Sequence, residues 1–517
     1  MHWAERIADR LIAEHPQRQT YVCAAGISPS GPVHIGNFRE VVTTSFVVKA
    51  LRRKGKEVRF IFSWDDFDRF RKVPSNLDPA FAQYIGLPYS QVPCPYGCHT
   101  SYAEHFEKEF EQALQVFGNE PEFIYQSREY QSGRYHPQIL HALRRREEIY
   151  DILMSFKTDV SSAEERAAFY PIHLYCGQCG KDSTTILGFD DQAETVAYRC
   201  ACGHSSTVYI PQADNIKLHW KIDWPMRWQQ EQVVFEPGGR DHSSETGSYN
   251  VASVIAERIF GYRPPVYEPY EFISIKGSFA KMSSSSGNNY TPDDLLRIYA
   301  PENILFLFAK YQPDAAFHIG LDEDVLRNYA EYERYAAGAA VGTLTGDLAD
   351  ALMLSQRSDS AGSSVSFGQV SSLLPLVGFN RVLLRSILAR NGEEIDELQL
   401  QRMADRAEYW IRNWMPHKLV TIQTSPNYAY YHSLSGVELR WLRSLCALLR
   451  NDGLDEAEFM SAIYAICHHE DKKTMRTQQK RLFTIVYQLV LRTDEGPRLP
   501  WLIQAAGREQ MLNLLDL

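Results

Sequence analysis

Residues 20–63 read TYVCAAGISPSGPVHIGNFREVVTTSFVVKALRRKGKEVRFIFS, and this stretch decides the fold. Thr20–Ala25 and Val58–Ser63 are short apolar runs, which predicts two buried strands. Between them, a loop rich in glycine and proline leads into a helical pattern from about Gly36 to Arg53, which Lys54-Gly55-Lys56 ends. Strand, loop, helix and strand form a βαβ unit. We therefore expect an α/β fold with a Rossmann-like, doubly wound parallel sheet.

The rest of the chain changes character along its length. Between about Gln91 and Pro211, cysteines occur in pairs, Pro and Gly are frequent, and apolar periodicity is weak apart from a helical pattern near Tyr135–Phe156. Strand patterns return at Gln232–Phe235 and Tyr270–Ile275. Beyond about Tyr290 the pattern is helical almost throughout, which predicts an all-α C-terminal domain.

The length of 517 residues is too great for one hydrophobic core and favours about three structural units. We expect a Rossmann-like catalytic domain at 1–290, which includes a zinc-binding insertion at 91–211. A linker should follow at 291–350, and a helical domain at 351–517.

The composition is that of an ordinary globular protein, with 44% hydrophobic and 23% charged residues. We find no apolar run near the ~18 residues that a membrane span needs, and the N-terminal MHWAERIADR is charged where a signal peptide would be apolar. These features favour a cytoplasmic protein that does not enter a membrane. The net charge of -10 argues against nucleic-acid binding by bulk electrostatics, so any such ligand would need a local basic stripe.

The loop Ser28–Asn37 lies between the first expected strand and the first expected helix, which is where doubly wound sheets bind ligands. Its glycines permit close approach of the backbone to a phosphate, and the helix N-terminus adds N–H groups with partial positive charge. The His34 ring and the Asn37 amide can each donate to a phosphate oxygen. For His-Ile-Gly alone, a tight turn with a hydrogen-bonded histidine is an equally good interpretation.

His34-Ile35-Gly36-Asn37, preceded by Pro29-Ser30-Gly31, resembles the first signature of the class I aminoacyl-tRNA synthetases, and Lys281–Gly287 (KMSSSSG) resembles the second. The resemblance implies that both segments flank the triphosphate of ATP, bound with Mg²⁺. An amino acid carboxylate then attacks the α-phosphorus, a step accelerated mainly by positioning and charge neutralisation. Ser284 stands where the usual motif has a second lysine, which marks either a subgroup or a weakened paralogue.

The same resemblance implies roles for individual residues. The expected catalytic residues are His34, Asn37, Lys281 and Ser283. The expected ATP-binding residues are Ser30, Gly31, His34, Gly36, Asn37, Ile273, Lys281, Met282, Ser283 and Ser284. Ile273 belongs to the expected strand Tyr270–Ile273, whose backbone reads adenine in the family.

Three further strings make the overall resemblance greatest to the class I lysyl-tRNA synthetases: Ser63–Lys72 (SWDDFDRFRK), Lys221–Trp228 (KIDWPMRW) and Glu236–His242 (EPGGRDH). The resemblance runs the full length and implies ATP-dependent transfer of lysine to tRNA(Lys). The residues expected to bind the amino acid are Ser28, Asp65, Asp66, Asp68, Trp220 and His242.

Physical chemistry supports a lysine pocket here, because a buried ammonium must be paired with a carboxylate. The three aspartates follow a parallel strand and should point into the crevice beside the phosphate loop. Trp220, Trp224 and Trp228 offer aromatic walls and cation–π contact, although core packing is the expected role of at least two of them. Alternatively, the aspartates cap the next element and pair with Arg69 and Arg71. A glutamyl- or glutaminyl-type enzyme would instead use such an arginine to bind its substrate.

Seven of the nine cysteines lie within the first 202 residues, and their pairing favours metal over disulfides. Cys176-x2-Cys179 with Cys200-x-Cys202 suits a tetrahedral structural zinc, with His204 as a substitute ligand. Cys94-x3-Cys98-His99-x5-His105 offers two sulfurs and two imidazoles for a second zinc, or forms a loop with free thiols. The resemblance implies that this insertion lies near the tRNA acceptor end.

The densest basic stretch of the C-terminal region is Lys472–Arg481, in which Lys473, Arg476 and Lys480 share a helical face. It can contact the tRNA backbone or simply be solvated. The resemblance implies that the helical domain reads the anticodon, with 291–350 contacting the tRNA stem. Two other functions stay open: an adenylating enzyme that does not serve tRNA, and a tRNA-binding regulator with a decayed site. A monomer is the working expectation.

Overall fold

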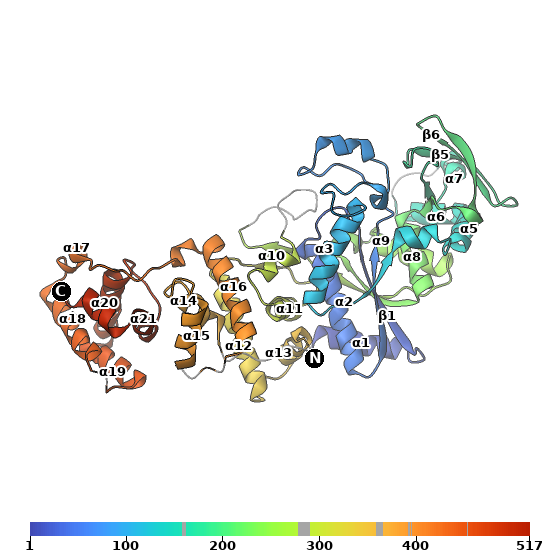
Figure 1. The fold of residues 1–517 in the computed structure, drawn as a ribbon. Coiled ribbons are helices and arrows are strands. Elements are labelled where there is room, and N and C mark those ends of the chain that lie inside the picture. The colour runs from blue at the N-terminus through green and yellow to red at the C-terminus, as the bar shows by residue number, and fades with distance from the viewer. Residues whose placement is uncertain (158–161, 278–289, 358–364, 391–392, 394, 452) are drawn as a thin grey trace. The chain divides into compact units, whose positions relative to one another are not determined.

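The computed structural model describes residues 1–157, 162–277, 290–357, 365–390, 393, 395–451 and 453–517 (Figure 1). The chain forms two compact units. The first is made of Met1–Leu296, Pro301–Gly320 and Tyr335–Ser360, and the second of Arg297–Ala300, Leu321–Arg334 and Ala361–Leu517. The expected linker 291–350 is thus shared between both units, and the functional division at 290 and 350 stays a prediction.

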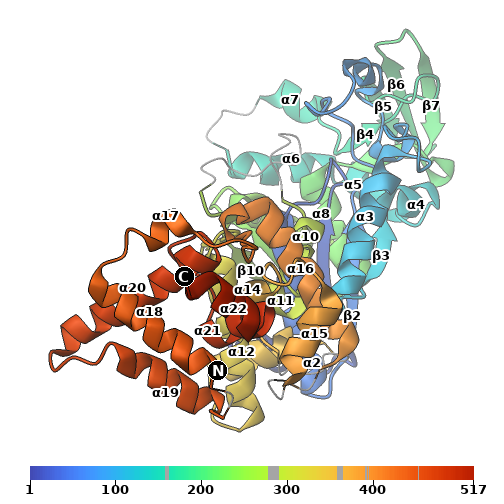
Figure 2. The same cartoon turned by 60° about the vertical axis from the view of Figure 1, so that its left-hand side comes forward.

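The first unit is built on a five-stranded sheet with the order β10-β9-β1-β2-β3, in which every neighbouring pair is parallel. Its strands are β1 Thr20–Ile27, β2 Glu57–Trp64, β3 Glu122–Tyr125, β9 Val233–Gly239 and β10 Val266–Tyr270. Helices cover both faces of the sheet (Figures 1 and 2). They are α1 Trp3–Glu14, α2 Ile35–Arg53 and α3 Tyr102–Val116 on one face, and α8 Trp220–Glu231 and α9 Ser248–Arg258 on the other. The predicted doubly wound fold is confirmed.

Burial on both faces explains why β1 reads as a continuous apolar run instead of an alternating one. Val22 and Ala24 join a core with Trp224 and Trp228 of α8. The intervening residues of β1 point to the opposite face and are also buried, beneath α2.

The insertion expected at 91–211 begins later in the structure than predicted, because α3 Tyr102–Val116 and β3 Glu122–Tyr125 belong to the sheet domain. β3 pairs with β2 in the central sheet, and Phe110 of α3 packs against Phe38 and Phe62 at ring-centroid distances of 6.3 and 5.8 Å. These elements therefore belong to the sheet domain, because the apolar face of α3 is buried on it. The remaining insertion holds the antiparallel pair β4 Ile172–Leu174 and β8 Ile216–Leu218 and the antiparallel sheet β5 Thr184–Asp190, β6 Thr195–Cys200 and β7 Ser205–Tyr209. Its helices are α4 Gln126–Gln131, α5 His136–Arg144, α6 Arg146–Ser155 and α7 Ala163–Ala168.

The expected strand Tyr270–Ile273 is wrong, because β10 ends at Tyr270 and the chain then joins a different sheet. The new strand, β11 Ile273–Ile275, pairs in parallel with β12 Phe317–Ile319. The buried guanidinium of Arg39, on α2, explains the break. It donates to the carbonyl of Glu271 at 2.7 Å and to those of Gln312 and Ala315 at 2.9 Å, so it occupies a carbonyl that a continuing strand would pair.

The second unit is helical, as predicted for the C-terminal third. Its helices are α14 Phe367–Leu373, α15 Arg381–Arg390, α16 Glu397–Trp414, α17 Tyr428–Tyr431, α18 Gly436–Leu449, α19 Glu456–Ile466, α20 Lys472–Val490, α21 Leu499–Ala506 and α22 Arg508–Leu515. Side-chain caps start several of them. The Ser435 hydroxyl and the Glu438 carboxylate form a reciprocal capping box on α18, and Asp471 accepts from the Thr474 N–H at 2.7 Å at the start of α20.

Further helices complete the first unit or contribute to both. They are α10 Pro292–Leu296, α11 Pro301–Ala309, α12 Asp324–Ala340, which has residues in both units, and α13 Asp347–Ser355. The 3₁₀ helices are η1 Pro79–Tyr84, η2 Tyr89–Gln91, η3 Ile210–Gln212, η4 Arg240–His242 and η5 Pro416–Lys418. Among the described residues, no helix combines the length and apolar content required to cross a bilayer.

Candidate active site

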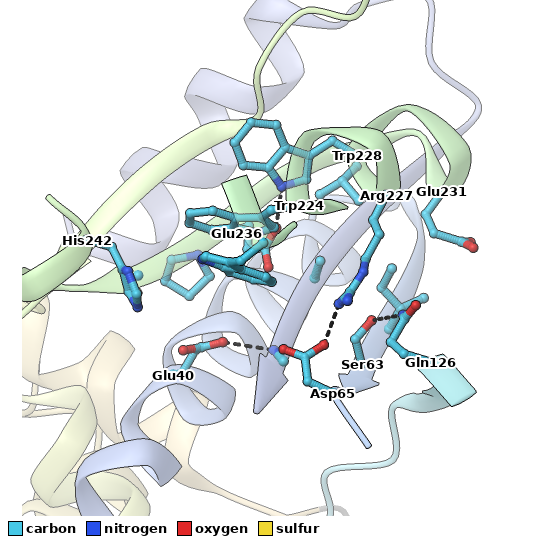
Figure 3. Close-up of a pocket in the computed structure, with 17 residues that line it drawn as sticks. Glu40, Ser63, Asp65, Gln126, Trp224, Arg227, Trp228, Glu231, Glu236 and His242 are labelled. Carbon is cyan, nitrogen blue, oxygen red and sulfur yellow. Dashed lines mark hydrogen bonds and ion pairs between the residues drawn. The ribbon is translucent and has the colours of Figure 1, made fainter. Parts of the chain in front are cut away.

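A pocket opens at the carboxyl ends of β1, β2 and β9, where a doubly wound sheet binds its ligands (Figure 3). Gly26 of β1, Ser63 of β2 and Glu236 of β9 line it. Three of the residues expected to bind the amino acid also line it, namely Asp65, Trp220 and His242.

One wall of the pocket is aromatic and comes from a single helix. Trp220 and Trp224 of α8 stack with ring centroids 5.0 Å apart and an interplanar angle of 17°, and Trp228 lies 5.0 Å beyond Trp224. The spacing of four residues places all three indoles on one helical face. His242 lies against this wall, with its ring 5.9 Å from that of Trp224. All three tryptophans line the pocket, and Trp224 and Trp228 are also buried in the core beside it, as expected for at least two of them.

The pocket is also lined by carboxylates, two of which were not predicted from the sequence. Glu40 of α2 accepts from the Gly26 N–H and from the Tyr270 hydroxyl, both at 2.8 Å. Glu236 of β9 is buried and accepts from the indole N–H of Trp228 at 2.6 Å. Asp65, also buried, is the third carboxylate (Figure 3).

These carboxylates are held where water reaches them poorly. Burial raises the pKa of Glu40 to about 8 and that of Glu236 to about 7. Like charges add to both shifts, because Glu236 lies near Glu40 and Asp65 lies near Glu236. Both carboxyl groups therefore hold protons readily near neutral pH, and a cation placed between them would favour their ionised forms. The arrangement is suited to binding an ammonium group.

The pocket's arginine is already neutralised by aspartates. Arg227 of α8 donates to Asp65 at 2.6 Å and pairs with Asp223 one helical turn away. The Nζ of Lys217, on β8, lies 3.7 Å from a carboxylate oxygen of the same Asp223 and also pairs with Asp68. Both cations are buried, and a buried cation needs such partners.

Two of the three predicted aspartates do not line the pocket. Asp66 accepts from the Ser127 N–H at 2.7 Å and from its hydroxyl, so it caps the start of α4 instead of binding a substrate. Asp68 is paired with Lys217 and accepts from the Ser28 hydroxyl at 3.2 Å. The expectation that Ser28, Asp66 and Asp68 line the amino acid pocket is thus not met. A helix cap and a charge network occupy them.

The predicted phosphate loop leads into α2, with His34 as its N-cap. Its Nδ1 accepts from the backbone N–H groups of Gly36 and Asn37 at 3.1 and 3.3 Å. Since Nδ1 accepts, the neutral ring carries its proton on Nε2, which is the nitrogen able to donate to a phosphate. The first-turn N–H groups that we expected to bind phosphate are occupied by this cap. The groups of this segment that the cap leaves for a ligand are the side chains of His34 and Asn37 and the preceding glycine loop.

Two backbone contacts hold the phosphate loop at its ends. The carbonyl of Ser30, next to Gly31, accepts from the Tyr102 hydroxyl at 2.9 Å. The N–H of Ile35 donates to the carbonyl of Tyr290 at 2.9 Å. Lys281, Met282, Ser283 and Ser284 lie outside the described residues. Tyr290 follows that segment closely in sequence, so the chain beyond the second signature is bonded to the first.

Both predicted metal-binding groups are gathered in space. We call Cys94, Cys98, His99 and His105 the first cluster, and Cys176, Cys179, Cys200 and Cys202 the second cluster. In each cluster the four donor atoms lie within 4.8 Å of one another. Sulfurs on a tetrahedral zinc lie about 3.8 Å apart. In the first cluster, the Sγ atoms of Cys94 and Cys98 lie 3.8 Å apart. In the second, the Sγ–Sγ distance is 3.8 Å for Cys176 and Cys202 and 3.6 Å for Cys179 and Cys200. Four protein ligands suit a structural ion, and four cysteines leave His204 unnecessary.

Glu40 and Glu236 were not predicted from the sequence, although it carries a signal for each of them. Glu40 lies four residues after Gly36, so it shares a helical face with the signature, and it is the one carboxylate of α2. Glu236 ends the apolar run of β9, directly before Pro237-Gly238. Tyr267 crowds Gly238, where a Cβ atom would lie 2.4 Å from the tyrosine oxygen, so only glycine fits this edge of the pocket.

The whole chain is similar to known tRNA synthetases. The family model described as "tRNA synthetases class I (K)" matches residues 1–351. A lysine--tRNA ligase of Treponema pallidum is 35% identical, covering 100% of this chain and 98% of its own length. One of Pyrococcus horikoshii is 31% identical over 100% and 99% of the two chains, and one of Borreliella burgdorferi is 44% identical over 65% and 63%. The resemblance inferred from the signatures is confirmed, and this chain belongs to the class I (K) family of tRNA synthetases.

Proposed function

We propose that this protein activates L-lysine with ATP and transfers it to the 3'-terminal adenosine of tRNA(Lys). The observation that carries the proposal is the charge of the pocket. Glu40, Asp65 and Glu236 line it, and Arg227 is the only lysine or arginine among its described lining residues and is already paired. A glutamate substrate would meet carboxylates there, whereas a lysine would meet its counter-ions.

Each group of the pocket then has a role in holding lysine. Glu40, with the Tyr270 hydroxyl beside it, binds the ε-ammonium. Asp65 orients the α-ammonium, and the stack of Trp220 and Trp224 lines the aliphatic stem. His242 closes the same wall. Which carboxylate holds which nitrogen is part of the proposal, and exchanging their roles would keep the specificity for a cation.

ATP, bound with Mg²⁺, occupies the phosphate loop. His34 and Asn37 donate to its phosphate oxygens, with Ser30, Gly31 and Gly36 at close approach, and the lysine carboxylate attacks the α-phosphorus to release pyrophosphate. Lys281 and Ser283 neutralise the transition state from the second signature, with Met282 and Ser284 beside them. Ile273, the first residue of β11, contributes backbone contacts to adenine. The bond between Ile35 and Tyr290 supports a common location for the two signatures.

The second unit binds the tRNA in this proposal, with its anticodon read by the α-helical domain. On α20, Lys473, Arg476 and Lys480 are exposed on one face and provide phosphate contacts. The reaction takes place in the cytoplasm, and each metal cluster holds one structural zinc ion.

Amino-acid-dependent pyrophosphate exchange tests the function directly. The parent protein should exchange with lysine and not with glutamate or glutamine. Exchange with glutamate alone would replace the lysine assignment by a glutamyl-type one. Exchange with lysine but no charging of total tRNA would point to an adenylating enzyme with another acceptor, and no exchange at all would point to a regulator.

A further inference from the structure

The first cluster is connected to the phosphate loop through one buried tyrosine. The cluster surrounds the start of α3, because its last ligand, His105, lies on the first turn of that helix. A metal ion held there fixes where α3 begins. Tyr102, the first residue of α3, is fully buried, and its hydroxyl donates to the carbonyl of Ser30 at 2.9 Å.

The second cluster has an equivalent connection to a different loop. Tyr175 directly precedes the ligand Cys176 and is buried. Its hydroxyl donates at 2.7 Å to the carbonyl of Phe67, which lies in the middle of the loop Asp65–Asp68. The backbone of Tyr175 is fixed in turn, because its N–H donates to the carbonyl of Asn215 at 2.9 Å.

We propose that each metal cluster positions one wall of the active site through its tyrosine. Tyr102 sets the phosphate loop for ATP, and Tyr175 sets the loop Asp65–Asp68 for the amino acid. The proposal rests on the function proposed above. Both tyrosines are positioning residues, because they bond to backbone carbonyls of the site and touch neither substrate.

The hydroxyl groups can be removed without disturbing the packing of the rings. The ring of Tyr102 stacks on Tyr89 at 5.7 Å and packs edge-on against Phe70 at 5.4 Å. The ring of Tyr175 lies 5.1 Å from that of Phe67. A change to phenylalanine keeps these contacts and deletes one hydrogen bond to a loop carbonyl.

The experiment compares Tyr102→Phe and Tyr175→Phe with Tyr21→Phe as a matched control. Tyr21 is also fully buried and donates to a backbone carbonyl, that of His15 at 2.9 Å, but at the opposite end of β1. KM for ATP and for lysine is measured by pyrophosphate exchange. Hydrogen–deuterium exchange of peptides covering residues 26–37 and 64–72, together with zinc content, supplies readouts that need no activity.

Each variant is expected to affect one substrate and one loop only. Tyr102→Phe should raise KM for ATP about three- to tenfold, because one hydrogen bond is lost. It should increase hydrogen–deuterium exchange only in residues 26–37. Tyr175→Phe should raise KM for lysine by a similar factor and increase hydrogen–deuterium exchange only in residues 64–72. Zinc content should stay unchanged in both, and Tyr21→Phe should alter neither loop. Equal effects on both substrates, or unchanged exchange in both loops, would overturn the proposal.

Gradual chelation of the parent protein tests the role of the metal ions. Each cluster has one exposed cysteine, Cys98 or Cys202. The first cluster is still more accessible, because it has no buried ligand whereas Cys176 and Cys200 of the second are buried, so it should lose its ion first. Exchange in 26–37 should then rise before exchange in 64–72. Loss of the first ion without a change in 26–37 would contradict the proposal. If lysine were not the substrate, the parent would lack lysine-dependent activity, yet the loop-specific hydrogen exchange would still separate the variants.

Discussion

The phosphate loop and the amino acid pocket lie side by side but are held together by different forces. The loop is fixed by hydrogen bonds to and from its backbone, through the His34 ring, the Tyr102 hydroxyl and the carbonyl of Tyr290. The pocket depends on buried charges, with Arg227 between two aspartates and with the carboxyl groups of Glu40 and Glu236, whose pKa values are raised by burial. The bonds made by the Tyr102 hydroxyl and the Ile35 N–H join neutral groups that do not titrate near neutral pH, whereas buried carboxylates and their counter-ions do respond to pH. The two regions should therefore respond differently to mutation and to pH.

The largest effect should come from the phosphate loop. His34→Ala removes a donor to the transition state, so kcat for pyrophosphate exchange should fall about 10²–10³-fold while KM for lysine changes little. Steady-state exchange kinetics with varied lysine measures both quantities. Lys281→Ala should behave similarly, because it acts on the same charge. A comparable loss of lysine affinity in the His34 variant would show that the two regions are not separable.

Substitutions in the pocket should have a smaller effect on activity, and they should change KM for lysine instead of kcat. Glu40→Gln keeps the shape of the side chain but removes the counter-ion for the ammonium. KM for lysine should rise about 10–100-fold, since hydrogen bonds to charged groups contribute about 1.5–3 kcal/mol. KM for ATP should stay close to that of the parent. An unchanged KM for lysine would remove Glu40 from the binding site, and Glu236→Gln, assayed alongside, would then identify the alternative carboxylate.

Lysine binding should strengthen as the pH rises towards 8. Burial raises the pKa of Glu40 to about 8, so the carboxyl is protonated below that pH before lysine binds. The ammonium favours the ionised form, so binding releases a proton and is favoured by higher pH. Calorimetric titration should show the dissociation constant falling by up to about tenfold per pH unit and levelling above about 8. The Glu40→Gln variant should show a weaker dependence.

The smallest effect on catalysis is expected at Asp66. Asp66→Asn weakens the cap on α4 formed with Ser127, so thermal unfolding should report a loss of about 1–2 kcal/mol. KM for lysine should change less than about threefold, since the side chain faces away from the pocket. Asp65→Asn is the matched comparison, because it should weaken lysine binding more strongly. A large rise in KM for the Asp66 variant would return it to the substrate site.

Much of this protein could be read from contiguous strings in the chain. The βαβ unit, the phosphate loop with His34 as its centre and the helical C-terminal region all follow from local patterns, and both metal clusters follow from cysteine spacing. Such features can be predicted from sequence because the interacting residues lie within a few helical turns or one hairpin of each other in the chain, so local geometry brings them together.

The amino acid pocket could not be assigned in this way. Three aspartates within four residues looked equivalent, yet Asp65 faces the pocket, Asp66 caps a helix and Asp68 pairs with Lys217. The partners that separate them come from segments about 60 to 160 residues away in the chain. The same holds for Glu40, whose role depends on burial against Tyr270. Burial and distant partners set which acid is charged, and only the folded chain supplies both.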